Sequence, residues 1–156
     1  AAVSRWLQTL PDGRWRDAAV QHFCMYLAAT QPATALEWAQ TIEDAAQRAA
    51  TLAHIAGQWA RVDPAAASEW LTSLAAGRTR DLAVQQFAMQ LAQTMPALAA
   101  EWAGSIGVED VRMATLSAVA STWLQVNRAE AVEWLSSAPL PENVRAALLQ
   151  KSGARQ

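Results

Sequence analysis

The sequence has few charged residues, almost no lysine or cysteine, and no long apolar run. Only 17% of its 156 residues are charged, and Lys151 is the single lysine. Its arginines are scattered, so the clustered cations that bind nucleic-acid phosphates are missing and we expect no nucleic-acid partner. The single cysteine, Cys24, excludes an intrachain disulfide and a cysteine-based metal site. No stretch approaches the roughly 20 apolar residues that span a bilayer, so we expect a soluble chain without a membrane span.

Residue groupings that carry catalysis are also missing. The sequence shows no Ser/His/Asp or Cys/His arrangement, no glycine-rich phosphate loop and no paired-carboxylate motif. His22 and His54 stand alone, without a clear set of metal ligands around them. We therefore expect no enzymatic activity, no cofactor and no metal site. Residues 1–5 do not resemble a signal peptide, and the compartment stays open.

Alanine and tryptophan are the residues in excess. The chain has 37 alanines, and eight tryptophans against two phenylalanines and one tyrosine. Alanine is the best helix former, while alternating runs of β-branched residues, which favour sheets, are scarce. The composition predicts an all-α protein.

Tryptophans also mark a tandem repeat. One recurs every 32 residues, at Trp6, Trp38, Trp70, Trp102 and Trp134. Proline precedes it at Pro32, Pro64 and Pro96. A stronger period of 64 residues lies on top, because residues 6–69 and 70–133 share many identities, such as Asp17 with Asp81 and Met25 with Met89. A fixed period of this size indicates stacked helical units.

Each unit is expected to hold a short and a longer helix. Ala35, Trp38, Ala39 and Ile42 form one apolar stripe of the short helix. Because such a hairpin cannot bury its apolar face alone, consecutive hairpins must stack. We predict an α-solenoid of about five antiparallel helical hairpins, hence about ten helices. It forms one array over residues 1–152, with repeats starting near residues 1, 33, 65, 97 and 129 and a frayed tail at 153–156.

Turn residues suggest how the helices are joined. Gly13 and Gly77 stand where a helix ends in a left-handed residue, and Gly107 is expected to act similarly. Asp44 suits the start of the following helix, since its carboxylate can accept a hydrogen bond from a free backbone N–H there.

The proline-to-tryptophan spacing resembles that of the tetratricopeptide class of helical repeats, in which a proline closes one repeat and a tryptophan opens the next. The resemblance covers the whole chain at the level of architecture. The unit here is 32 residues instead of the usual 34, and the glycine and tyrosine of the first helix are missing. The resemblance implies a protein-binding scaffold and names no ligand.

One charged pattern recurs in register with the repeat. A glutamate precedes most of the repeat tryptophans, and an arginine follows ten residues after them. We expect an ion-pair ladder of Glu37 with Arg48, Glu69 with Arg80, and Glu101 with Arg112, because an arginine on an inward stripe needs a partner. The alternative is that the glutamates form an acidic stripe that binds a basic peptide.

The leading functional hypothesis is a non-catalytic scaffold that binds a protein or peptide in a shallow groove of the first helices. The alternative is the helical scaffold region of a larger enzyme, for example a cell-wall-processing one. The candidate groove residues are polar and lie beside or opposite the tryptophan stripe: Gln8, Glu37, Gln40, Glu69, Thr72, Glu101, Glu133 and Ser136.

Two expectations concern burial. Seven tryptophans follow the repeat and are expected in the core, whereas Trp15 has Thr79 as its counterpart and is expected to be exposed. Cys24 replaces alanines at an inward position and should be buried.

The first hairpin lacks the polar cap with which helical arrays usually end, because its first ten residues are as apolar as an internal helix. We therefore expect a longer array, or a homodimer or end-to-end contact through the N-terminal hairpin.

Overall fold

A computed structural model describes residues 2–153, in which the regular secondary structure is entirely helical, without a strand. Ten helices follow one another along the described chain, which confirms the all-α prediction. They are α1 (Ala2–Leu7), α2 (Arg14–Leu27), α3 (Pro32–Ala39), α4 (Ala45–Val62), α5 (Pro64–Ser73), α6 (Arg78–Leu91), α7 (Pro96–Gly104), α8 (Glu109–Val126), α9 (Arg128–Ser137) and α10 (Glu142–Gly153).

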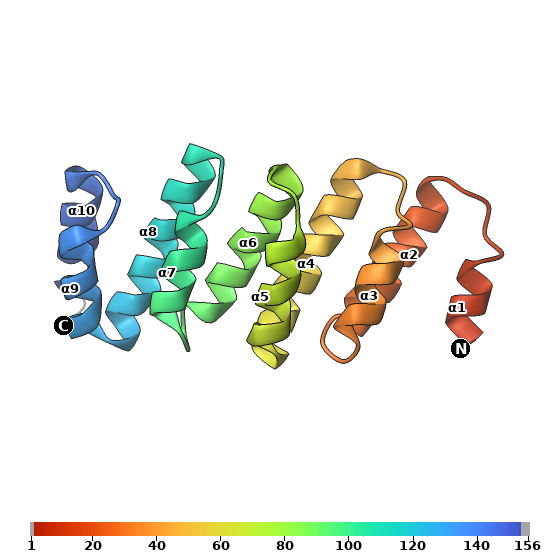
Figure 1. Cartoon of the computed structure of the whole chain (residues 1–156), viewed down its shortest axis with the longest axis horizontal. Coiled ribbons are helices and arrows are strands. Elements are labelled where there is room, and N and C mark those ends of the chain that lie inside the picture. Colours follow the sequence, from red (N-terminus) through yellow and green to blue (C-terminus); the bar gives the residue numbers. More distant parts are fainter. Residues whose placement is uncertain (1, 154–156) are drawn as a thin grey trace.

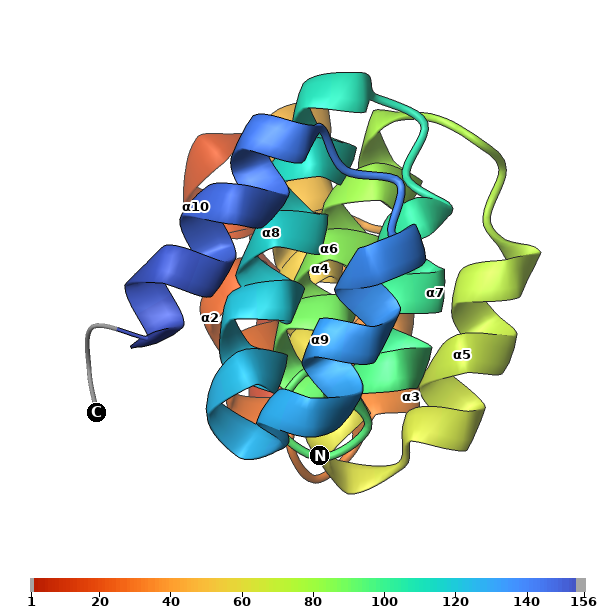
Figure 2. The same ribbon diagram turned by 90° about the vertical axis from the view of Figure 1, so that its left-hand side faces the viewer.

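The helices alternate between a short and a long one, and they lie side by side in chain order. Figure 1 shows the short helices α3, α5, α7 and α9 in front and the long helices α4, α6 and α8 behind them, with the two chain ends at opposite ends of the row. In Figure 2, which looks along the row, the two sets form two layers, and α5 stands outermost among the short helices. The short helices therefore form one broad face of the molecule.

Local sequence explains where the helices begin. Pro32, Pro64 and Pro96 each occupy the first turn of a short helix, where a missing N–H costs nothing. Asp44 caps α4 by accepting a hydrogen bond from the Gln47 N–H at 2.7 Å, as its position predicts. Asp63 caps α5 in the same way, from the Ala66 N–H at 3.0 Å.

The glycines of the turns do not all behave as expected. Gly13 and Gly77 have φ angles of 122° and 149°, which side-chain-bearing residues rarely adopt, and each immediately precedes a long helix. The prediction that they end a helix is wrong, since Gly13 and Gly77 are the N-cap residues of α2 and α6 and lie several residues beyond the ends of α1 and α5. Gly107 has no positive φ, so the prediction of a left-handed residue there is also wrong. Its turn is held by side-chain hydrogen bonds, described below.

The buried apolar residues form two clusters that meet at α4. One contains Leu7, Val20 and Ile42 and reaches Ile55 of α4. The other starts at Ala56 of α4 and continues through Phe87 to Leu140. Between α4 and α6 the helices approach closely, since a Cβ on Gly57 would lie 3.4 Å from the Cβ of Gln86.

The ends of the predicted array are described only in part. Gly153, the first residue of the tail expected at 153–156, ends α10. The rest of that tail and Ala1, the expected first residue of the array, lie outside the described residues.

Candidate functional site

The eight candidate groove residues lie on or directly after the short helices, and all of them are exposed. Four are glutamates at the same position of successive short helices: Glu37, Glu69, Glu101 and Glu133. Three others lie three residues after one of these glutamates: Gln40, Thr72 and Ser136. The last, Gln8, lies three residues after Arg5. Since the short helices lie in a row (Figure 1), these side chains line one face of the molecule. We call the four glutamates the acidic row.

The expected ion-pair ladder is not formed. None of Glu37, Glu69 and Glu101 lies within 4.0 Å of an arginine nitrogen in the part of the chain that the structure describes. Their intended partners bind backbone carbonyl groups instead. Arg48 donates to the Ile42 carbonyl at 2.6 Å, and Arg112 to the Ile106 carbonyl at 2.8 Å. The ladder prediction is therefore wrong.

A second pair of arginines reaches across to the following hairpin. Arg16 of α2 donates to the Thr41 carbonyl at 2.9 Å, and Arg80 of α6 donates to the Ser105 carbonyl at 3.0 Å. Carbonyl groups at the end of a helix carry partial negative charge and lack partners inside the helix, which is why they attract a guanidinium. Arg16, which has no glutamate in its own repeat, also lies 3.8 Å from Asp12.

Two buried aspartates complete this arrangement, and the sequence reasoning assigned them no role. Asp17 accepts hydrogen bonds from the backbone N–H groups of Glu43 and Asp44, at 3.0 to 3.1 Å. Asp81 does the same for Gly107 and Val108, at 2.9 and 3.0 Å. The sequence held one signal that could have pointed to this role: Asp17 and Asp81 are the same residue at equivalent positions of the 64-residue period.

The tryptophans form aromatic pairs between hairpins. In each pair a tryptophan of a short helix meets an aromatic ring of the preceding long helix, at centroid distances between 5.4 and 6.3 Å. The pairs are Phe23 with Trp38, Trp59 with Trp70, Phe87 with Trp102, and Trp123 with Trp134.

Burial of the tryptophans follows from this pairing. Trp123 is buried. The other five tryptophans of these pairs are half-buried: Trp38, Trp59, Trp70, Trp102 and Trp134. Trp6 has no described long helix before it and is 55% exposed, so the prediction that it belongs to the core is wrong. Trp15 is 78% exposed, which confirms the expectation from its non-repeating position.

A shallow hollow lies at one point of the acidic row. Its volume is about 360 Å³, and it is lined by Arg80, Glu101, Trp102 and Ser105. The Arg80 guanidinium lies 6.0 Å from the centre of the Trp102 ring and donates to the Ser105 hydroxyl at 3.2 Å. This hollow therefore presents a carboxylate and an indole beside an arginine that is already engaged.

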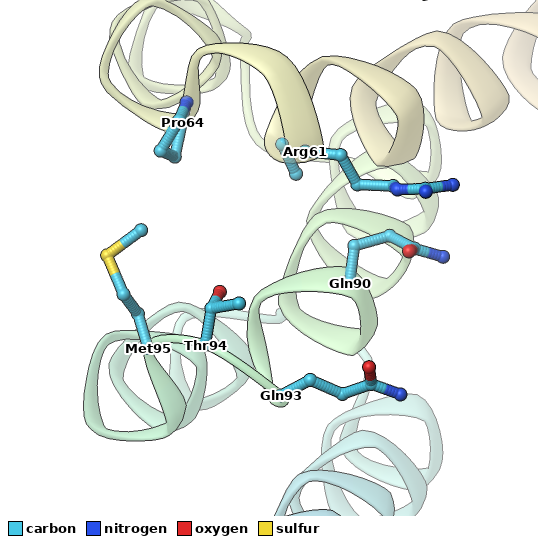
Figure 3. Close-up of a pocket in the computed structure, with 7 residues that line it drawn as sticks. Arg61, Pro64, Gln90, Gln93, Thr94 and Met95 are labelled. Atoms are coloured by element: carbon cyan, nitrogen blue, oxygen red, sulfur yellow. The ribbon is translucent and has the colours of Figure 1, made fainter.

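A larger cavity of about 470 Å³ opens where two adjacent hairpins are joined, at the end of α4 and of α6. In Figure 3 the Met95 side chain extends toward Pro64, while the Arg61 and Gln90 side chains run in the same direction as each other. Its complete lining is Ala60, Arg61, Pro64, Gln90, Gln93, Thr94 and Met95. Amides, one hydroxyl and one guanidinium can bind polar groups, but the lining has no carboxylate or imidazole that could activate the hydroxyl.

The residues with potential chemical reactivity lie apart from these hollows. Cys24 is fully buried, as expected, and its thiol donates to the Ala35 carbonyl at 3.3 Å. Burial raises the pKa of the Cys24 thiol to about 11, although a hydrogen bond from the backbone of Cys24 itself acts in the opposite direction, so the thiol stays protonated at neutral pH. His22 is exposed and His54 half-buried, and no group of three potential metal ligands occurs among the described residues.

None of the helices within residues 2–153 is long and apolar enough to cross a membrane. A scan against protein-family models, a search of curated proteins and a search of solved structures each found no match to this chain.

Proposed function

We propose that the protein is a non-catalytic scaffold, an α-solenoid of tetratricopeptide-like 32-residue repeats, which binds a basic peptide segment along the acidic row. The observation that carries the proposal is that Glu37, Glu69, Glu101 and Glu133 are exposed, recur in four successive short helices and have no cationic partner within ion-pair distance among residues 2–153. The ion-pair ladder and the acidic stripe were alternative interpretations of the same glutamates. Because the ion pairs of the ladder are not formed, the acidic stripe is favoured.

The arrangement of the arginines supports this proposal. The three arginines that were expected to pair with the row donate instead to carbonyl groups of the turns after α3 and α7, which leaves the glutamate side chains free to meet a ligand. A row of like charges along one face raises the local concentration of an oppositely charged ligand and orients it. Exposed pairs contribute only about 0.2–1 kcal/mol each, so we expect modest, salt-sensitive binding.

Peptide titrations test the proposal directly. A fluorescently labelled peptide of alternating lysine and alanine should bind at low ionic strength, and its glutamate–alanine counterpart should not. The double variant Glu69→Lys/Glu101→Lys should weaken binding about tenfold, since two attractive contacts become repulsive. Added salt should weaken binding to the unmodified chain, because exposed charges are screened over about 10 Å at 0.1 M salt.

The matched control is Glu43→Lys/Glu109→Lys. It changes the net charge equally but alters exposed carboxylates outside the short helices. We expect this variant to bind nearly as well as the unmodified chain. Equal weakening in both double variants would mean that only net charge matters, and failure of the lysine peptide to bind at low salt would overturn the proposal.

A further inference from the structure

Helix α5 buries less of its surface than the short helices on either side of it. Only Ala67 and Leu71 of its ten residues are buried, whereas the shorter helices α3 and α7 bury three residues each. The apolar residue in the turn that follows differs as well: Ile42 after α3 and Ile106 after α7 are 1% exposed, but Leu74 after α5 is only half-buried. The packing of α5 therefore removes less apolar surface from water.

Side-chain hydrogen bonds show the same contrast. The Cys24 thiol of α2 donates to the Ala35 carbonyl of α3, and the turns after α3 and α7 each receive an arginine and an aspartate of the preceding long helix. Helix α9 also buries only two residues, but Arg145 of α10 donates to two carbonyl groups at its end. In the described structure, the side-chain hydrogen bonds of α5 all stay within the helix and its Asp63 cap.

The two long helices behind α5 pack on each other without its help. They approach closely at Gly57, and α5 stands in front of them as the outermost of the short helices (Figure 2). Ala67 and Leu71 belong to the same buried cluster as Ala60 of α4 and Val84 of α6. Helix α5 thus covers an apolar seam that α4 and α6 already close from behind.

Both ends of α5 border open space. The cavity of about 470 Å³ reaches Pro64 at the start of the helix, and a second hollow of about 360 Å³ is lined by residues 74–80, which include the turn after it. That turn contains Gly77, whose φ is 149°. Turns beside open space can change their backbone angles without displacing a packed neighbour, and a few such residues are enough to form a hinge.

We propose that α5 is a flap: residues 64–77 open as a unit from α4 and α6 while the other helices stay folded, with hinges in the two turns that flank α5. Opening uncovers the apolar seam, including Trp59, whose ring centre lies 6.3 Å from that of Trp70 in the closed state. It also removes Glu69 from the middle of the acidic row, although the flap requires no ligand at that row. Segments with few buried contacts open at a lower free energy than the rest of a fold.

Thiol labelling tests the flap at one repeat position in two helices. Ala67 of α5 and Ala99 of α7 lie 32 residues apart, and both are fully buried. In a chain whose own thiol is removed by Cys24→Ala, either Ala67→Cys or Ala99→Cys places a single thiol beneath one helix. Each rate of reaction with the thiol reagent DTNB is divided by that of the same chain unfolded in urea. We expect Ala67→Cys to react at least about tenfold faster than Ala99→Cys, because α5 lacks both the burial and the hydrogen bonds that hold α7.

The response to denaturant identifies the kind of opening. Low concentrations of urea should leave the rate for Ala67→Cys nearly unchanged, since opening one helix exposes little surface. Hydrogen exchange of the unmodified chain is a second measurement that needs no substitution: the backbone amides of α5 should exchange about tenfold faster than those of α7. Equal labelling at the two positions, or equal protection of the two helices, would overturn the proposal. A rate for Ala67→Cys that rises with urea in parallel with global unfolding would overturn it too, because α5 would then open only with the whole chain.

Discussion

Two kinds of turn alternate from α1 to α8, although both connect a short helix to a long one. The turns after α3 and α7, at residues 40–44 and 105–108, receive an arginine and a buried aspartate from the preceding long helix. The turn after α5, residues 74–77, receives no hydrogen bond from α4 in the described structure and relies on Gly77 at a φ of 149°. We call the first kind clamped turns and the second a glycine turn.

The difference explains why the sequence repeats over 64 residues as well as over 32. The clamping aspartates are Asp17 in α2 and Asp81 in α6, and the same position holds Ala49 in α4 and Met113 in α8. A helix without the carboxylate cannot bind the N–H groups of the next turn, so that turn must satisfy its backbone locally. One structural unit is therefore a pair of hairpins in which the first clamps the second.

The largest effect should come from removing a clamp. Asp81 is 5% exposed and accepts two part-buried backbone N–H groups, so Asp81→Ala removes the partner of both at once. We expect the free energy of unfolding to fall by about 2–4 kcal/mol in chemical denaturation followed by circular dichroism. Asp12→Ala, at an exposed carboxylate of the turn after α1, is the control and should cost less than about 0.5 kcal/mol. A loss below about 1 kcal/mol for Asp81→Ala would show that the clamp is not what holds the turn.

A smaller effect is expected in the glycine turn. Gly77 has open space around its α-carbon, so Gly77→Ala costs only the strain of its backbone conformation, about 1–3 kcal/mol. Thermal and chemical denaturation measure this cost. Gly104→Ala, at the end of α7 and equally uncrowded, should be neutral or slightly stabilising. Equal outcomes at the two glycines would contradict the role assigned to Gly77.

Much of the fold follows from the register of proline and tryptophan. Helices α3, α5 and α7 begin at the three prolines, because proline fixes φ and lacks the N–H that a helix start leaves free. The Asp44 cap was likewise predictable, since a capping side chain acts within its own few residues. These are local rules, which a sequence shows directly.

The sequence failed where the partner lies in another hairpin. Spacing placed Glu37 and Arg48 in neighbouring helices, but it does not show that Arg48 stands opposite the end of α3, where the Ile42 carbonyl competes for it. The exposure of Trp6 was missed for the same reason: a tryptophan at its position is covered by the preceding long helix, as Trp38 is by α2. The candidate groove residues are exposed in the structure, and their role as a binding row stays a prediction.

The smallest effect, and the one that best separates the two kinds of turn, is expected for Gly107→Ala. A Cβ on Gly107 would lie 3.3 Å from an Asp81 carboxylate oxygen, which is tight. However, Glu43 occupies the same place in the other clamped turn and keeps its N–H bond to Asp17 at 3.0 Å. A clamped turn therefore accommodates a side chain there, and neither residue needs a positive φ.

For this reason Gly107→Ala should change the free energy of unfolding by no more than about 0.5 kcal/mol, and alanine's smaller freedom in the unfolded chain favours a slight gain. Together, Gly107→Ala and Gly77→Ala compare the effect of the same substitution on the free energy of unfolding in a clamped turn and in the glycine turn. A loss above about 1 kcal/mol would mean that the Asp81 clamp is tighter than the Asp17 clamp. The two pairs of hairpins would then differ in structure at a position where they share the same hydrogen bonds.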